Sequence, residues 1–165
     1  MKKSTMFLAS AVAAVALFFS TNVNAQSSPK FGVGLNVGVP TATGGRLAIG
    51  ADLRYQFDID RQLSIPLTTG YTNFSYKGGG NSGYIPLKAG LKYFFNETGA
   101  GAYGLAEAGA GFSTTSGGGT SFLYSPALGY SWSNGIDLAA KYEGLSNNGV
   151  SNGYVGLRLA YGFKL

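Results

Sequence analysis

Large apolar residues alternate with small or polar residues along most of the chain after residue 30. In the final stretch, every second residue from Val155 is large and apolar, and the residues between are glycine, alanine, Arg158 or Lys164. A two-residue repeat is typical of a β-strand, in which successive side chains point to opposite faces. Beyond residue 30, no segment places apolar residues at helical spacing. The pattern therefore predicts an all-β fold.

Clusters of Gly, Asn, Asp, Ser or Pro interrupt the alternation at regular intervals, as turns between strands do. They divide the chain into eight predicted strands, at residues 31–39, 46–57, 63–72, 84–95, 101–112, 122–132, 136–145 and 152–165. In the segment 101–112 we place Glu107 on the polar face, which leaves Ala106, Ala108, Ala110 and Phe112 on the apolar face. Connections after the odd-numbered strands look slightly longer, so we expect longer loops at one end and tight turns at the other.

Alternation alone does not say whether the apolar face points into a soluble barrel or out into lipid. The polar face consists mostly of Gly, Ala, Ser and Thr with isolated charges, which suits a narrow interior. Aromatic residues gather at the strand ends with aliphatic residues between them, and a bilayer favours such rings at the headgroup level. At the tight-turn end the expected interface aromatics are Phe31, Tyr55, Phe57, Tyr93, Phe95, Tyr130, Trp132, Tyr161 and Phe163.

The predicted strands are 9 to 14 residues long, which is enough for the roughly 9–11 residues that cross a bilayer at a tilt. In lipid the sheet must close, because an open edge leaves backbone groups unpaired. We therefore predict an eight-stranded antiparallel up-and-down transmembrane β-barrel. If the two faces were inverted, the alternative would be a soluble, lipocalin-like carrier.

Residues 1–25 have the form of a cleavable signal peptide. Lys2 and Lys3 precede an apolar run from Met6 to Phe19, and a polar stretch leads to Ala25, after which we expect cleavage. The run is shorter than the roughly 20 residues of a transmembrane helix. No cysteine follows the cleavage position, which excludes a lipid-anchored lipoprotein. The expected organisation is a signal peptide (1–25), a short periplasmic segment (26–30) and an outer-membrane barrel (31–165).

Charge and composition argue against several classes of function. Charged residues make up 12% of the chain, roughly half the share of a soluble domain. The net charge of +5 falls further if Lys2 and Lys3 are removed, and it is too scattered to suggest a nucleic-acid partner. The chain has no His, which removes imidazole bases and His-metal sites, and its glycine runs match no nucleotide-binding motif. We expect no enzymatic activity, no metal and no cofactor.

The alternating strands, the leader and the C-terminal residues Tyr161 and Phe163 resemble the OmpA/OmpX-type small outer-membrane β-barrels, a porin-family "outer membrane protein beta-barrel" domain. Leu165 stands where the C-terminal assembly signal of that family usually has an aromatic residue. The resemblance covers residues 31–165. It implies a monomer in the outer membrane of a Gram-negative bacterium, with periplasmic termini and outward-facing longer loops. The implied partners are outer-membrane lipid and the barrel-assembly machinery. The acyl transferases of the family rely on a His that this chain lacks.

Charges on the polar face would lie inside the barrel, where eight strands leave room for little besides side chains. Buried charges need partners, so we expect Arg158 to pair with Glu143 and Lys88 to pair with Glu107. Arg46 and Lys164 are also expected to point inward. The predicted interior charge network comprises Asp52, Arg54, Lys88, Lys92, Glu107, Asp137, Lys141, Glu143 and Arg158.

The first functional hypothesis is a structural or surface-contact role, with the lumen plugged by side chains. The alternative is a narrow channel or transporter that passes ions or small solutes through the basic lumen.

Overall fold

A computed structural model describes residues 30–147 and 149–164. Residue 164 is described by its backbone only. The expected signal peptide lies outside the described residues. Eight strands account for most of the described chain: β1 (Lys30–Pro40), β2 (Gly45–Asp58), β3 (Leu63–Tyr76), β4 (Asn81–Phe94), β5 (Gly101–Ser113), β6 (Thr120–Ser131), β7 (Ile136–Asn147) and β8 (Val150–Lys164). Within this part of the chain, no helix is long and apolar enough to cross a membrane.

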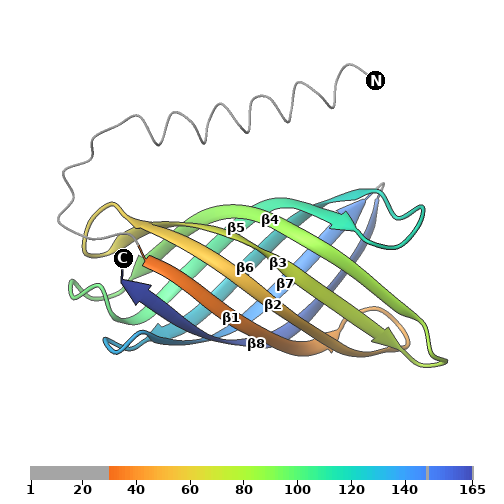
Figure 1. Ribbon diagram of the computed structural model, residues 1–165, viewed down its shortest axis with the longest axis horizontal. Helices are drawn as coiled ribbons and strands as arrows, with labels where there is room; N and C mark the ends of the chain where they lie inside the picture. The colour runs from red at the N-terminus through yellow and green to blue at the C-terminus, as the bar shows by residue number, and fades with distance from the viewer. Residues whose placement is uncertain (1–29, 148, 165) are drawn as a thin grey trace, which may run out of the picture.

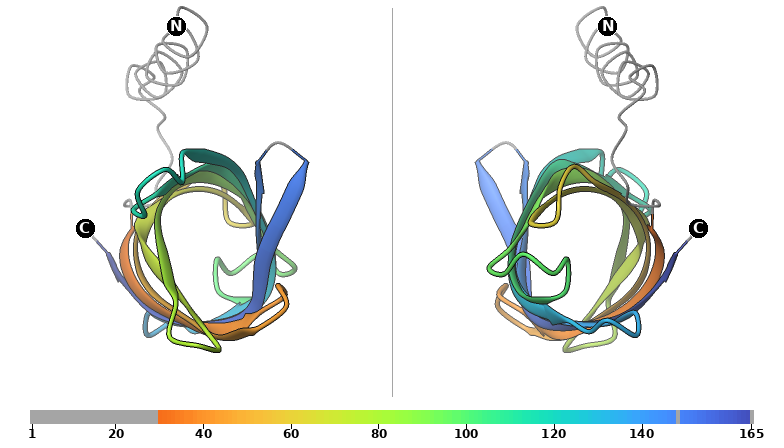
Figure 2. Two further views of the ribbon diagram at one scale, coloured as in Figure 1. Left: turned by 90° about the vertical axis from the view of Figure 1, so that its right-hand side faces the viewer. Right: turned by 90° about the vertical axis from the view of Figure 1, so that its left-hand side faces the viewer.

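The strands form one closed sheet in chain order (Figure 1). Each strand pairs antiparallel with the next, and β1 closes the ring by pairing with β8 from Lys30↔Lys164 to Pro40↔Tyr154. The end-on views show the resulting ring (Figure 2). A closed sheet has no edge, so the backbone groups of every strand find partners within the barrel. The prediction of an all-β, eight-stranded, up-and-down barrel is confirmed.

The two ends of the barrel are named here by their connections. The turn end holds residues 59–62, 95–100 and 132–135, and it is also where β1 begins and β8 ends. The loop end holds residues 41–44, 77–80 and 114–119. The expectation of longer connections at the loop end is wrong. Several polar residues expected in these loops belong to the strands instead, as the paired positions Ser75↔Asn81 and Asn147↔Val150 show.

Most of the large apolar side chains of the described strands lie on the outer face of the barrel. Leu157 and Leu159 are 53% and 55% exposed, whereas Arg158 between them is 3% exposed. The aliphatic positions of β1 and β2 follow the same rule, with Leu35 at 66% and Leu53 at 47%. This is the predicted orientation. It is the opposite of the inverted arrangement that a soluble carrier would have.

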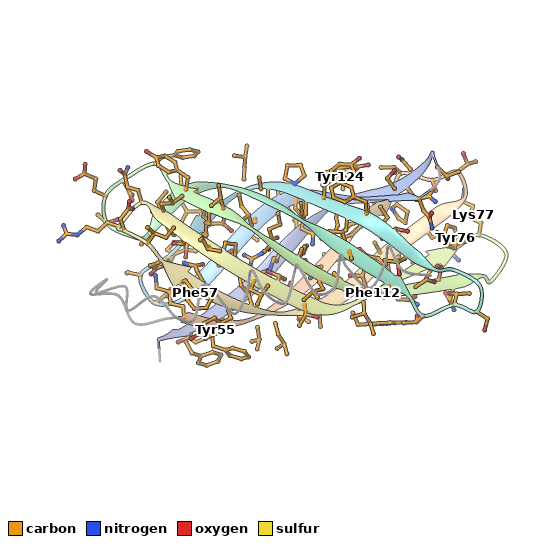
Figure 3. All side chains as sticks on the ribbon, turned by 90° about the horizontal axis from the view of Figure 1, so that it is seen from above. Tyr55, Phe57, Tyr76, Lys77, Phe112 and Tyr124 are labelled. Carbon is orange, nitrogen blue, oxygen red and sulfur yellow. The ribbon has the colours of Figure 1, made fainter. Side chains whose placement is uncertain are left out.

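All nine of the predicted interface aromatics extend from outward-facing positions near the turn end. Residues two apart on one strand bring their rings together, as in Tyr55–Phe57 (centroids 4.6 Å apart) and Tyr161–Phe163 (4.8 Å). Figure 3 shows Tyr55 and Phe57 toward the turn end, and Tyr76 and Lys77 at the opposite end.

Glycines on the inner face let the backbones of neighbouring strands approach closely. At Gly90 on β4, an added Cβ would collide with the backbone carbonyl oxygen of Ala106 on β5. Gly162 on β8 differs, because the nearest atom to an added Cβ is the carbonyl oxygen of Gly135, 3.8 Å away. Close approach of the backbone therefore demands glycine at 90, whereas position 162 has space in front of it.

We predict that Gly90→Ala lowers the free energy of unfolding by about 1–3 kcal/mol, the usual cost of forcing an atom into a packed site. The control, Gly162→Ala, should change it by less than about 0.5 kcal/mol. Urea unfolding in detergent micelles, followed through the fluorescence of the single tryptophan, Trp132, measures both. Equal stability of the two variants would contradict this account of the inner face.

Candidate functional site

The barrel interior holds the nine charged side chains that the sequence placed there. Each is at most 7% exposed. Five are cations and four are carboxylates: Arg54, Lys88, Lys92, Lys141 and Arg158 against Asp52, Glu107, Asp137 and Glu143. Each of these carboxylates contacts at least one of the cations.

Arg158 and Asp52 form the most directional pair in the interior. Arg158 Nη2 lies 2.6 Å from Asp52 Oδ1, and Nε lies 2.9 Å from Oδ2. Asn36 Nδ2 donates a further hydrogen bond to Asp52 Oδ2 at 2.7 Å. Such a two-pronged contact between a guanidinium and a carboxylate is stronger and more directional than a single hydrogen bond.

Gly34 on β1 provides the space for this pair. It lies between Asp52 on β2 and Ala160 on β8 in the strand register. An added Cβ at Gly34 would lie 2.8 Å from Arg158 Nη2. The guanidinium therefore crosses directly over the backbone of β1 to reach β2.

A second group centres on Glu107. Arg54 Nη2 lies 3.1 Å from Glu107 Oε2, and Lys88 Nζ lies 3.6 Å from the same oxygen. Thr68 Oγ1 donates to Glu107 Oε1 at 2.6 Å and accepts from Arg54 Nε at 3.0 Å. The structure thus brings together Lys88 and Glu107, the pair expected across β4 and β5.

Glu143 centres a third group nearer the loop end. It accepts from Lys141 Nζ at 3.0 Å, from Lys88 Nζ and from the hydroxyl of Tyr84. Because Lys88 also lies near Glu107, it connects the second and third groups. The second and third groups thus form one connected set, and Arg158, Asp52, Asp137 and Lys92 form another.

The expected pair of Arg158 with Glu143 is wrong. In the β7–β8 register, Glu143 lies opposite Tyr154, four residues from Arg158, which is about 13 Å along a strand. Arg158 lies opposite Ala139, and the nearest acidic position on β7 is Asp137, whose Oδ1 is 3.5 Å from Arg158 Nη1. Glu143 was expected as the partner because it lies on the strand next to Arg158. The two residues are too far apart along the barrel axis to form a pair.

The expected inward position of Arg46 is also wrong. The side chain of Arg46 is exposed. The β2–β3 register shifts between Gly45 and Leu47, so Arg46 falls on an irregularity where the two-residue alternation breaks. The side chain of Lys164 lies outside the described residues.

Two inward-facing aromatic clusters were not predicted. The cluster near the loop end contains Ala48, Phe74, Tyr84, Leu123 and Tyr154, and the cluster nearer the turn end contains Phe94, Tyr103, Leu105 and Ala139. A signal for them was present. Tyr103 and Leu105 share the parity of Glu107, and Tyr154 shares that of Arg158. Placing Glu107 on the polar face already implies that Tyr103 and Leu105 point inward, but aromatic residues were assigned to the outer face in general, so no inward cluster was predicted.

A cavity of about 750 Å³ opens between the charge network and the turn end. Its inner end includes Arg54, Lys92, Asp137 and Arg158. Part of its wall is made by the small residues Gly32, Ala160 and Gly162. On the other side of the charged residues lie the buried side chains of the loop-end aromatic cluster, with Tyr76 and Leu145 packed against them.

The interior chemistry is that of paired charges. Tyr103 adds a hydroxyl that donates to Asp137 Oδ1 at 2.6 Å, and Lys92 Nζ lies 2.8 Å from Asp137 Oδ2. Lys92 Nζ also lies 3.9 Å from the centre of the Tyr103 ring, a cation–π contact. In the described part of the chain, no group of three or more His, Cys, Asp or Glu residues is placed to hold a metal ion.

We predict that Asp52→Asn destabilises the barrel by about 3 kcal/mol, because it removes the main counter-charge of buried Arg158. A double-mutant cycle with Arg158→Met should give a coupling of about 2 kcal/mol. The matched cycle, Glu143→Gln with Arg158→Met, should give less than about 0.5 kcal/mol. Unfolding in detergent micelles measures both cycles, and equal couplings would reject the assignment of Asp52 as the partner.

Comparison with known proteins supports the fold. The sequence matches no protein-family model and no curated protein. Solved structures do match. The attachment invasion locus protein Ail of Yersinia pestis is 18% identical with a TM-score of 0.60, and the alignment covers 84% of this chain and 100% of Ail.

The N-terminal β-barrel domain of Pseudomonas aeruginosa OprF is 16% identical with a TM-score of 0.60, covering 84% of this chain and 100% of that domain. Neisserial surface protein A is 15% identical with a TM-score of 0.59, covering 83% and 98%. At these identities the likeness establishes architecture. The expected resemblance to small outer-membrane barrels is confirmed at the level of the fold: the chain has the closed eight-stranded barrel that these proteins share.

Proposed function

We propose that this protein is an integral β-barrel of a bacterial outer membrane, with a structural or surface-contact role and a lumen closed by its own side chains. The observation that carries the proposal is the division between an apolar outer face and a charged inner face. In water, a barrel would be expected to have the reverse arrangement, with charged residues outside and apolar residues inside. Lipid as the outer solvent explains why Leu35 is 66% exposed while Arg158 is 3% exposed.

The outer face also supports a bilayer by its sorting along the barrel axis. Aromatic residues such as Tyr93, Phe95 and Trp132 lie outward near the turn end, and Phe122 lies outward near the loop end. Aliphatic residues such as Leu87 and Leu157 are exposed between them. Aromatic girdles around an aliphatic band are the expected surface of an outer-membrane barrel.

Closure of the lumen is supported by the loop-end aromatic cluster. Phe74 lies with its ring centroid 5.6 Å from that of Tyr84 and 5.8 Å from that of Tyr154. These residues and Leu123 are at most 5% exposed. Together with the paired charges beside it, the cluster leaves a poor route for a hydrated ion.

The second candidate function is a narrow ion or small-solute channel. The cavity at the turn end favours it, because about 750 Å³ of space already leads from one mouth to the cationic groups. Passage would require the loop-end aromatic cluster to move.

Export and assembly complete the proposal. We infer that residues 1–25 are removed after Ala25, that the turn end faces the periplasm, and that the barrel-assembly machinery inserts the chain as a monomer in contact with outer-membrane lipid. Ail, which shares the fold, is named for attachment and invasion, in keeping with a surface-contact role and with the absence of enzymatic activity proposed here.

Leu159→Arg tests the bilayer. At an outward position well inside the apolar band, arginine should cost about 2–4 kcal/mol of folding free energy in lipid vesicles. The matched control Ile59→Arg, in a connection at the turn end, should cost about 0–1 kcal/mol. Both are measured by denaturant titration in vesicles with heat-modifiable gel mobility as the readout. If Leu159→Arg is as benign as Ile59→Arg, lipid does not contact this face.

Planar-bilayer recording separates the two candidate functions. The purified wild-type protein should show no stable conductance, since the loop-end aromatic cluster closes the lumen. The double variant Phe74→Ala with Tyr84→Ala should show openings, because it removes two of the rings. A control double variant of outward residues, Phe122→Ala with Tyr124→Ala, should stay silent. A stable conductance of the wild type would favour the channel.

A further inference from the structure

We propose that the cavity at the turn end is a binding pocket for a small oxyanion of the carboxylate or phosphate type, which enters through the turn-end mouth. The inference rests on the charges and the shape of the cavity. It holds whether the barrel acts as a structural protein or as a channel.

The charge balance of the interior calls for an additional anion. The charged residues that are at most 7% exposed comprise five cations and four carboxylates, and the Asp58 carboxylate, whose side chain is 8% exposed, is already paired with Lys30. An uncompensated charge in a low-dielectric interior is strongly unfavourable. A bound anion would neutralise the surplus without any change in the fold.

The surplus lies among three cations that share the carboxylates of Glu107 and Glu143, namely Arg54, Lys88 and Lys141. Of these, Arg54 lines the cavity, and it is 5% exposed. Its Nε donates to Thr68, and its Nη2 lies 3.1 Å from Glu107, a carboxylate that it shares with Lys88. In the described residues, Arg54 Nη1 has no hydrogen-bond partner. The other buried polar atoms without a partner belong to Asn36, Ser125 and Tyr154, none of which lines the cavity.

The cavity gathers cations around this guanidinium. Arg54, Lys92 and Arg158 all line it, and Asp137 is the acidic residue at the same depth. Nearer the mouth, the lining includes Lys30, Arg61, Asp58 and Asp60, with Lys30 Nζ 2.8 Å from Asp58 Oδ2. The lining is therefore cationic in total, five against three, and the excess lies toward its inner end.

Guanidinium and ammonium groups together select for oxyanions. Arginine offers planar paired N–H groups that match carboxylate and phosphate oxygens, and lysine adds a compact charge. A metal cation would be repelled by the same groups. A neutral solute would leave the surplus charge uncompensated.

The part of the wall beside these cations leaves space for the ligand, because Gly32 pairs with Arg54 in the β1–β2 register and Gly162 pairs with Gly32. An added Cβ at Gly162 meets only the Gly135 carbonyl oxygen at 3.8 Å, and one at Gly32 meets the Tyr161 carbonyl oxygen at 3.4 Å. Neither residue belongs to the charge network. A large side chain at position 162 would therefore fill the cavity and leave the ion pairs in place.

The test is a titration of the full-length barrel, refolded in octyl glucoside micelles, which carry no phosphate headgroups. Inorganic phosphate or acetate is added at constant ionic strength with sodium chloride as the balancing salt. Isothermal calorimetry and backbone amide NMR shifts are recorded. We expect saturable binding at millimolar concentrations, with the shifts concentrated around Gly32 and Gly162.

Three variants locate the site. Gly162→Phe should abolish binding by filling the cavity. Arg54→Met should weaken it by at least about tenfold, since it removes charge-assisted hydrogen bonds. Arg46→Gln, an exposed arginine near the loop end, should leave binding unchanged. Heat-modifiable mobility verifies that each variant is folded, and Gly162→Phe keeps the test decisive if Arg54→Met does not fold.

The proposal is overturned if the wild-type protein shows no saturable binding, or if folded Gly162→Phe binds as well as the wild type. It is also overturned if Arg46→Gln weakens binding as much as Arg54→Met, because the effect would then come from surface charge. The titration uses micelles and records no conductance, so its outcome is independent of the bilayer and channel tests.

Discussion

The structure depends on one constraint: the backbone of every strand must find its hydrogen-bond partners inside the sheet. Pairing of β1 with β8 meets it, because no strand is left as an edge. Once the sheet is closed, each residue faces either the interior or the surroundings. The two-residue repeat of the sequence then divides the protein into an apolar outside and a polar inside. The outer face, the inner network and the proposed location all follow from this division.

Closure also determines how the interior must be built. Eight strands enclose a space that side chains nearly fill, so charges placed there have to satisfy each other. Arg158 reaches across β1 to Asp52 because Gly34 leaves room, and Lys88 links Glu107 with Glu143. The two ends differ: the larger aromatic cluster is buried toward the loop end, whereas a cavity lined in part by glycines opens toward the turn end. This asymmetry underlies both the proposed closed lumen and the proposed anion pocket.

Parity along a strand is a local property, and it was therefore readable from the sequence. It predicted eight strands, the outward position of Leu159 and the inward position of Arg158. Partners across the barrel depend on strand tilt and register, which no local pattern contains. Arg158 was for that reason assigned to Glu143 on the neighbouring strand, although the register places Glu143 beside Tyr154. Arg46 was misplaced because a register shift breaks parity where the sequence shows nothing unusual.

The most direct test of the central claim is which solvent wets the outer face. The chain has no cysteine, so a spin label can be attached at single sites, Leu53→Cys, Leu157→Cys and Leu159→Cys, with Ser125→Cys as the inward control. In lipid vesicles, the account predicts frequent collisions of the three outward labels with dissolved oxygen, which partitions into lipid, and few with a water-soluble nickel chelate. The label at 125 should meet neither. Outward labels that collide mainly with the nickel chelate would contradict the account.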